Sequence, residues 1–132
     1  MLVDAGFEHG YQKAWAGEIG NDGGSANVAV FLFRDASRTS DVLASLQRIL
    51  SEDVLEKSAE TESVDASGLG QESSAIHADG EDEEIAYAWR TRNLVLVVDL
   101  LCFNQCDPAD HFREVARAYA DDVDARAEKV GG

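Results

Sequence analysis

The sequence lacks a complete catalytic or cofactor motif. No G-x-S-x-G phrase accompanies the three histidines, His9, His77 and His111, which lie far apart in the chain. Phosphate-binding loops of the G-x-x-x-x-G-K-[ST] or G-x-G-x-x-G type are also absent, so its paired glycines are expected to form turns. The motifs therefore assign no catalytic residues and no cofactor, and favour a protein that is not an enzyme.

Long apolar runs are missing as well. The longest are Leu94–Val98 and Leu100–Phe103, which Asp99 separates, whereas a membrane span needs roughly 18 to 20 apolar residues. Residues 1–10 have neither the basic nor the apolar region of a signal peptide. We expect a soluble chain without a transmembrane segment, and a mature exported domain would have the same features.

Positive charge is scarce, because 11 Lys and Arg face 26 Asp and Glu for a formal charge of -15. Such a field repels phosphate backbones and anionic lipids, so nucleic acids and acidic membranes are not expected partners. Three lysines stand beside eight arginines and nineteen alanines, which fits a genome of high GC content and also a surface adapted to high salt, which would screen the self-repulsion.

The length and apolar content indicate one domain. A chain of 132 residues with 45% hydrophobic residues can fill one modest core, so residues 1–132 are expected to form a single domain. Its order of elements then determines the fold class.

The first third predicts a hairpin and a helix. Residues 10–18 alternate in character, residues 21–24 form a turn cluster, and residues 26–33 are almost all apolar, as in a strand covered on both faces. A helix should follow from an N-cap at Ser40 and fray between Leu50 and Lys57. Its apolar face comprises Val42, Leu43, Leu46, Ile49 and Leu50.

The remaining chain predicts three strands and a second helix. Residues 71–79 alternate weakly, the acidic run Asp79–Glu84 suits a solvated turn, and residues 85–90 and 94–101 form the clearest hairpin. Asp107 and Pro108 are typical of a helix start. Its apolar face comprises Phe112, Val115, Ala116, Tyr119 and Val123, and the opposite face carries Arg113, Glu114, Arg117, Asp121, Asp124 and Glu128.

The order ββαβββα predicts an α+β fold, a mostly antiparallel sheet of about five strands with two helices packed on it.

Three short phrases carry a resemblance. They are V-x-x-F-x-D-A with Phe33, Asp35 and Ala36, G-L-G-(D/Q)-E with Gly68, Leu69, Gly70 and Glu72, and (F/W)-R-x-(G/R)-N-(L/V)-V with Trp89, Arg90, Asn93, Leu94 and Val95. With these phrases the chain resembles a loosely defined group of exported or lipid-anchored α+β domains of bacterial and archaeal type. Gln71 and Arg92 stand where that group more often has Asp and Gly. The resemblance implies a fold and export and supplies no catalytic residues.

Cys102 and Cys106 are the only cysteines. A short-loop disulfide would pin the last strand to the last helix and contribute roughly 2 kcal/mol in an oxidising compartment. Alternatives are two buried thiols, a redox pair with C-x-x-x-C rather than C-x-x-C spacing, and a zinc site that adds His111 with Asp107 or Asp110. The acidic residues near Gly80 do not have the spacing of a calcium loop, so no metal is assigned.

Four aromatic residues share strand parity: Tyr11, Trp15, Tyr87 and Trp89. They form either ordinary core or, if the face is open, a recognition surface with Arg90 and Arg92 nearby. We therefore expect a non-enzymatic, extracytoplasmic binding or interaction domain, as in the soluble part of a lipoprotein or sensor, for a small molecule or protein. The alternative is a small intracellular thiol or metal-dependent enzyme centred on Cys102, Cys106 and His111. The oligomeric state has no sequence signal.

Overall fold

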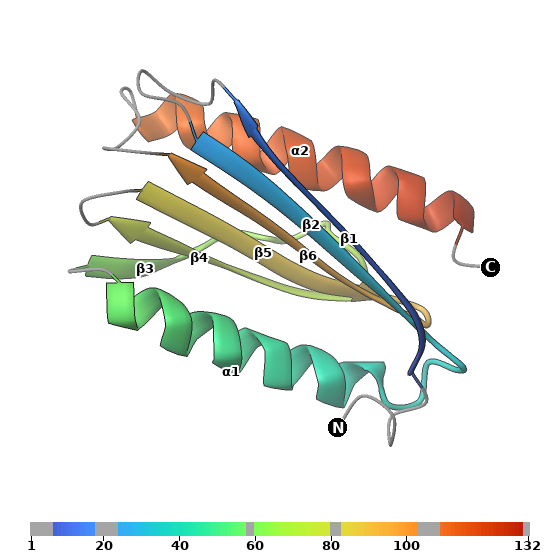
Figure 1. Cartoon of the computed structure of the whole chain (residues 1–132). Helices are drawn as coiled ribbons and strands as arrows, with labels where there is room; N and C mark the ends of the chain where they lie inside the picture. The colour runs from blue at the N-terminus through green and yellow to red at the C-terminus, as the bar shows by residue number, and fades with distance from the viewer. Residues whose placement is uncertain (1–6, 18–23, 58–59, 80–82, 103–108, 131–132) are drawn as a thin grey trace.

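The computed structural model describes residues 7–17, 24–57, 60–79, 83–102 and 109–130. Two helices and six strands follow one another along these segments (Figure 1). They are β1 (Phe7–Gly17), β2 (Gly24–Phe33), α1 (Thr39–Lys57), β3 (Glu60–Val64), β4 (Glu72–Asp79), β5 (Glu83–Thr91), β6 (Leu94–Cys102) and α2 (Ala109–Val130). The α+β class, the antiparallel sheet and the two helices are confirmed.

The strands form one sheet in the order β1-β2-β6-β5-β4-β3. Every neighbouring pair is antiparallel, and β6 lies at the centre between β2 and β5. The additional strand, β3, occupies a stretch without hydrophobic period, and it is paired with β4 from Glu60 opposite Asp79 to Val64 opposite Ala75. Its existence depends on that partner, since its own sequence does not distinguish two faces.

Each face of the sheet is covered by one helix (Figure 1). On the α2 face, Phe112, Ala116 and Ala120 pack with the odd-numbered residues of β5 and the even-numbered residues of β6. On the α1 face, Val42 and Leu43 pack with Ala88 and Val95. Because both faces are covered, β6 is apolar at every position except Asp99, and β5 is apolar from Ile85 to Trp89.

The helices match their predicted apolar faces with two differences. Ser40 is not the N-cap of α1, because the helix begins at Thr39, whose buried hydroxyl donates to the carbonyl oxygen of Ala36 (2.9 Å). Ile49 is 48% exposed, because the contacts of α1 are concentrated on one narrow stripe. Asp107 and Pro108, the predicted start of α2, lie outside the described residues.

Within the described residues, neither helix is long and apolar enough to cross a membrane. The acidic residue Glu83 is only 2% exposed, so the prediction of a solvated turn over residues 79–84 is wrong for this residue. Residues 80–82, the middle of that turn, are not described. Asp124 is also buried, although the helical period places it on the polar face of α2.

Candidate functional site

The aromatic residues of β5 belong to the core. Trp89 is 0% exposed, and its indole Nε1–H donates to Oδ1 of Asp124 on α2 (2.9 Å). Tyr87 is 1% exposed and lies two residues before it on the same face. The structure thus favours the core interpretation for Trp89, and α2 covers the face on which an open recognition surface was a hypothesis.

The other three predicted binding residues lie elsewhere. Tyr11 and Trp15 are in register with Val30 and Ala26 of β2, but their side chains are outside what the structure describes. Arg90 is next to Trp89 in β5 and therefore points to the opposite face. There its guanidinium binds Glu72, with Nε donating to Oε1 at 2.8 Å. The structure does not bring Arg90 to the aromatic cluster.

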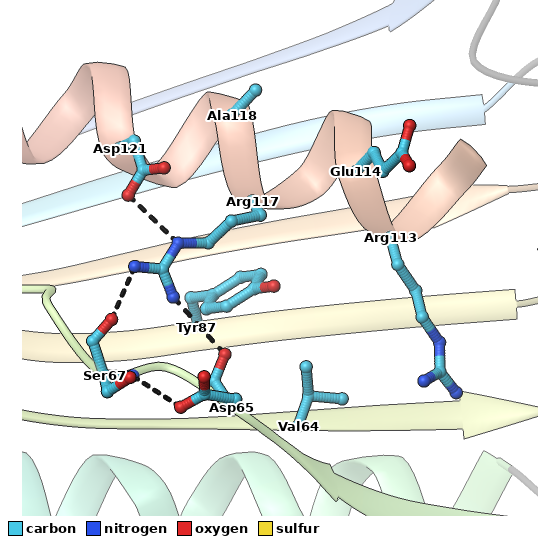
Figure 2. A pocket seen from close by; sticks show the side chains of 9 residues that line it. All are labelled: Val64, Asp65, Ser67, Tyr87, Arg113, Glu114, Arg117, Ala118 and Asp121. Carbon is cyan, nitrogen blue, oxygen red and sulfur yellow. Dashed lines mark hydrogen bonds and ion pairs between the residues drawn. The ribbon is translucent and has the colours of Figure 1, made fainter. Parts of the chain in front are cut away.

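A groove of about 540 Å³ runs beside α2, and we call it the α2 groove (Figure 2). Residues of β3, of the segment after it, of β5 and of α2 line it: Val64, Asp65, Ser67, Tyr87, Arg113, Glu114, Arg117, Ala118 and Asp121. Tyr87 provides the floor, and burial raises the pKa of its phenol. The groove therefore combines an apolar base with charged walls.

Arg117 holds the wall opposite α2 in place. Its Nη2 donates to the carbonyl oxygen of Ser67 (2.6 Å), its Nη1 to that of Asp65 (3.3 Å), and its Nε to the Asp121 carboxylate (3.0 Å) (Figure 2). Asp65 accepts the backbone N–H of Ser67 (3.0 Å), and this hydrogen bond lowers the pKa of the Asp65 carboxyl. Arg117 is thus committed to fixing the segment 65–67, and its charge is balanced locally by Asp121.

One turn before Arg117, Arg113 joins the groove to a buried polar cluster. Its Nη2 lies 3.1 Å from Nδ1 of His77, and Nε2 of the same imidazole lies 2.9 Å from the Glu83 carboxylate. Since a guanidinium only donates, Nδ1 must accept the hydrogen bond and Nε2 must carry the proton. His77 and Glu83 are 5% and 2% exposed, which excludes bulk solvent from this cluster.

The G-L-G phrase forms the turn that ends this wall. Gly68 and Gly70 have positive φ angles of 91° and 56°. The N–H of Gly70 lies 3.4 Å from Oδ2 of Asp124, and Leu69 between the two glycines is buried. Arg117 and Asp124, two turns apart on α2, therefore hold both ends of the segment 65–70.

Glu72, the first residue of β4, lies opposite Arg90 of β5 and connects β4 with α1 and β5. Ser40 of α1 donates to both carboxylate oxygens (2.9 and 3.0 Å), and Arg90 donates from β5. The hydrogen bond from Ser40 and then that from Arg90 lower the pKa of the Glu72 carboxyl. This cluster is partly exposed, and its hydrogen bonds tie α1, β4 and β5 together, so we regard it as structural.

The cysteine site is described only on the strand side. Cys102 is buried at the end of β6, opposite Glu83, and is not a free thiol in the structure. Cys106 and the side chain of His111 lie outside the described residues, so the Cys102–Cys106 bridge stays a prediction. Among the side chains that the structure does describe, no three His, Cys, Asp or Glu converge as a metal site would require.

Among the residues that build the groove, sequence reasoning singled out only Tyr87 as a binding residue. Arg113 and Arg117 are spaced as on a solvated helical face, and His77 and Glu83 lie in segments with no strong pattern. The available signal was the spacing of Arg113 and Arg117. Residues four apart lie on the same face of a helix, so the two arginines form a basic pair on a chain that is otherwise very acidic.

Comparison with known proteins assigns no family to this chain. No family model and no curated protein matches the chain. Among solved structures it is similar to the extracellular domain of PknH from Mycobacterium tuberculosis, with a TM-score of 0.46 and 11% identity over 92% of this chain and 68% of that one.

Proposed function

We propose that this chain is a non-enzymatic, extracytoplasmic binding domain whose binding surface is the α2 groove. The observation that carries this proposal is the construction of the groove. Its base at Tyr87 lies between α2 and the segment 65–67, which Arg117 holds with two hydrogen bonds while Asp121 of the same helix accepts a third. A wall fixed before binding reduces the conformational entropy that a ligand must overcome.

The charges of the groove favour a basic ligand with an apolar group. Arg117 is neutralised by Asp121, and Arg113 faces the cluster that contains Glu83. Asp65 and Glu114 remain as exposed carboxylates on the two walls. The formal charge of -15 adds a long-range attraction for cations. A protein segment that places an aliphatic side chain against Val64 and Ala118, above the buried Tyr87, and a Lys or Arg at the rim fits this surface.

Two observations support an extracytoplasmic location. The phrases around Phe33, Gly68 and Trp89 resemble exported domains, and Cys102 is not a free thiol. A disulfide persists in oxidising compartments. Thiol alkylation of the chain in intact cells, followed by mass spectrometry, tests the location: unmodified cysteines without reductant support export. Two alkylated thiols contradict it and favour the intracellular thiol or metal protein centred on Cys102, Cys106 and His111.

The binding surface is tested by titrating the isotope-labelled chain with a short peptide of alternating Lys and Leu. Amide shifts should change at Val64–Ser67, Tyr87 and 113–121, and affinity should fall as salt rises. Ala118→Arg places a cation and a long side chain in the groove and should weaken binding at least tenfold. The matched control Ala125→Arg is exposed on the same helix outside the groove and should bind normally. Equal affinities of the two variants contradict the proposal.

A further inference from the structure

One edge of the sheet is built for pairing. β1 has eleven residues and pairs with β2 from Phe7 opposite Phe33 to Gly17 opposite Gly24. No strand lies on its outer side among the residues that the structure describes. The outer backbone N–H and C=O groups of such a strand can be satisfied by another strand.

The two edges of the sheet differ in their protection. The other edge, β3, has five residues, two of which are Glu60 and Glu62. Short length and charge are common devices against edge-to-edge association. β1 is twice as long and contains no proline, and its register with β2 is continuous from His9 to Gly17 after a shift between Phe7 and His9.

Charge favours β1 over β3 as the edge that meets a second copy. Glu8 and Lys13 are the charged residues of β1, so this edge has a formal charge of zero on a chain of -15. A second copy of an acidic chain can therefore approach at β1 with less repulsion than at β3. Antiparallel pairing of two identical strands about one twofold axis also gives the outer backbone N–H and C=O groups of both copies hydrogen-bond partners.

We propose that β1 pairs with β1 of a second copy, antiparallel and centred on Gln12, to give a continuous twelve-stranded sheet. Gln12 is the midpoint of Phe7–Gly17, so this register overlaps all eleven residues and places the two Gln12 positions opposite each other. The inference is independent of the α2 groove, because residues of β3 and β5 line that groove and both strands lie in the half of the sheet away from β1.

The dimer should strengthen with salt. Each copy carries a formal charge of -15, and the Debye length falls from about 10 Å at 0.1 M salt to about 3 Å at 1 M. Screening removes repulsion between the copies, whereas it weakens the attraction of a basic ligand for the groove. Dimerisation should therefore increase with salt and ligand binding should decrease, so each proposal can be contradicted without affecting the other.

Sedimentation velocity of the full chain at 0.1 M and 1 M NaCl tests the dimer. Gln12→Glu and Gln12→Lys each place like charges opposite each other, so each should weaken dimerisation about tenfold at the salt where the unsubstituted dimer forms. An equal mixture of these two variants should restore it. Ser63→Glu and Ser63→Lys, exposed on β3, are the matched controls and should leave it unchanged.

Amide hydrogen exchange provides a second measurement. Amides of residues 7–17 should gain protection as the protein concentration rises, while those of residues 60–64 should not. A monomer at both salt concentrations overturns the inference. So does a dimer that Gln12→Lys strengthens and Gln12→Glu weakens, because net charge rather than β1 pairing then controls association.

Discussion

The indole of Trp89 and the carboxylate of Asp124 form a buried hydrogen bond of 2.9 Å that ties the sheet to the C-terminal half of α2. The second oxygen of Asp124 lies 3.4 Å from the N–H of Gly70, so one carboxylate joins β5, α2 and the G-L-G turn. Removing it leaves the buried Trp89 donor and the part-buried Gly70 donor without this acceptor, and an unpaired buried donor is more costly than a lost exposed contact.

Asp124→Leu should therefore lower the free energy of unfolding by about 2 to 3 kcal/mol, because the Trp89 and Gly70 donors lose their acceptor. Asp124→Asn retains one acceptor oxygen and should lose less, about 1 kcal/mol. Urea unfolding at pH 7 measures both. The matched control is Asp122→Asn, exposed on the same helix, which should change stability by less than about 0.5 kcal/mol. Equal effects at positions 122 and 124 would contradict the role of the hydrogen bond.

The two glycines of the G-L-G turn should differ in their tolerance of a side chain. A Cβ at Gly70 would meet the carbonyl oxygen of Arg90 and lie 2.9 Å from Cδ1 of Trp89, in a backbone with φ of 56°. At Gly68 the nearest atom is Nη2 of the flexible Arg117 side chain, at 3.3 Å.

Gly70→Ala should thus cost about 3 kcal/mol or more, the sum of left-handed strain and overpacking, and Gly68→Ala only about 1 to 2 kcal/mol. Thermal and urea unfolding of the two variants make the comparison, with Gly68→Ala as the internal control. A similar loss in both would show that the conformation of the turn, and not the approach of Arg90, sets the requirement.

The buried pair of His77 and Glu83 should be energetically coupled. His77→Leu leaves the Glu83 carboxylate, 2% exposed, without the imidazole donor and should cost about 3 kcal/mol. The double variant with Glu83→Leu should cost less than the sum of the single variants by about 1 to 2 kcal/mol. Additive losses contradict the coupling. Glu84→Gln, on the neighbouring half-buried residue of the opposite face, serves as the control.

Strong local patterns explain why most of the fold could be predicted. Ile85, Tyr87 and Trp89 alternate in β5, and Phe112 and Ala116 repeat at helical spacing in α2. The local sequence is therefore sufficient to predict which face of each element packs in the core. β3 lacks such a pattern because both parities of Glu60–Val64 are polar or small, and pairing with β4 determines its conformation.

The candidate site could not be predicted in the same way, because its contacts join distant segments. His77 and Arg113 are 36 residues apart, and Trp89 and Asp124 are 35 apart. Helical periodicity places Asp124 on the polar face of α2. The residue is nevertheless buried, and its carboxylate accepts a hydrogen bond from the Trp89 indole. Parity correctly grouped Tyr87 with Trp89, but it does not reveal that α2 covers both.

Arg92 offers a stabilising substitution. It has a φ of 54° in the two-residue turn between β5 and β6, where the resembling domains more often have Gly. Its backbone N–H donates to the Gln71 side chain (2.8 Å), a contact that Gly can also make. Arg92→Gly should relieve left-handed strain and raise stability by about 1 kcal/mol. Asn93→Gly should lower it, because the Asn93 side chain donates to the carbonyl oxygen of Phe33 (3.0 Å). Urea unfolding decides, and a loss in Arg92→Gly contradicts the strain argument.

Glu72 should make the structure sensitive to acid. The hydrogen bonds from Ser40 and Arg90 lower the pKa of its carboxyl in the folded state. The folded state therefore binds a proton less readily than the unfolded state, and the resulting stability is fully present above the unfolded pKa and is lost as pH falls through the lowered pKa. Unfolding free energies measured from pH 7 down to pH 3 should decline below about pH 4.5. Glu72→Gln should flatten part of that decline, whereas Glu52→Gln, exposed on α1, should retain it. An unchanged acid limb in Glu72→Gln would show that other carboxylates, such as Asp35 and Asp65 with their lowered pKa values, account for the acid sensitivity.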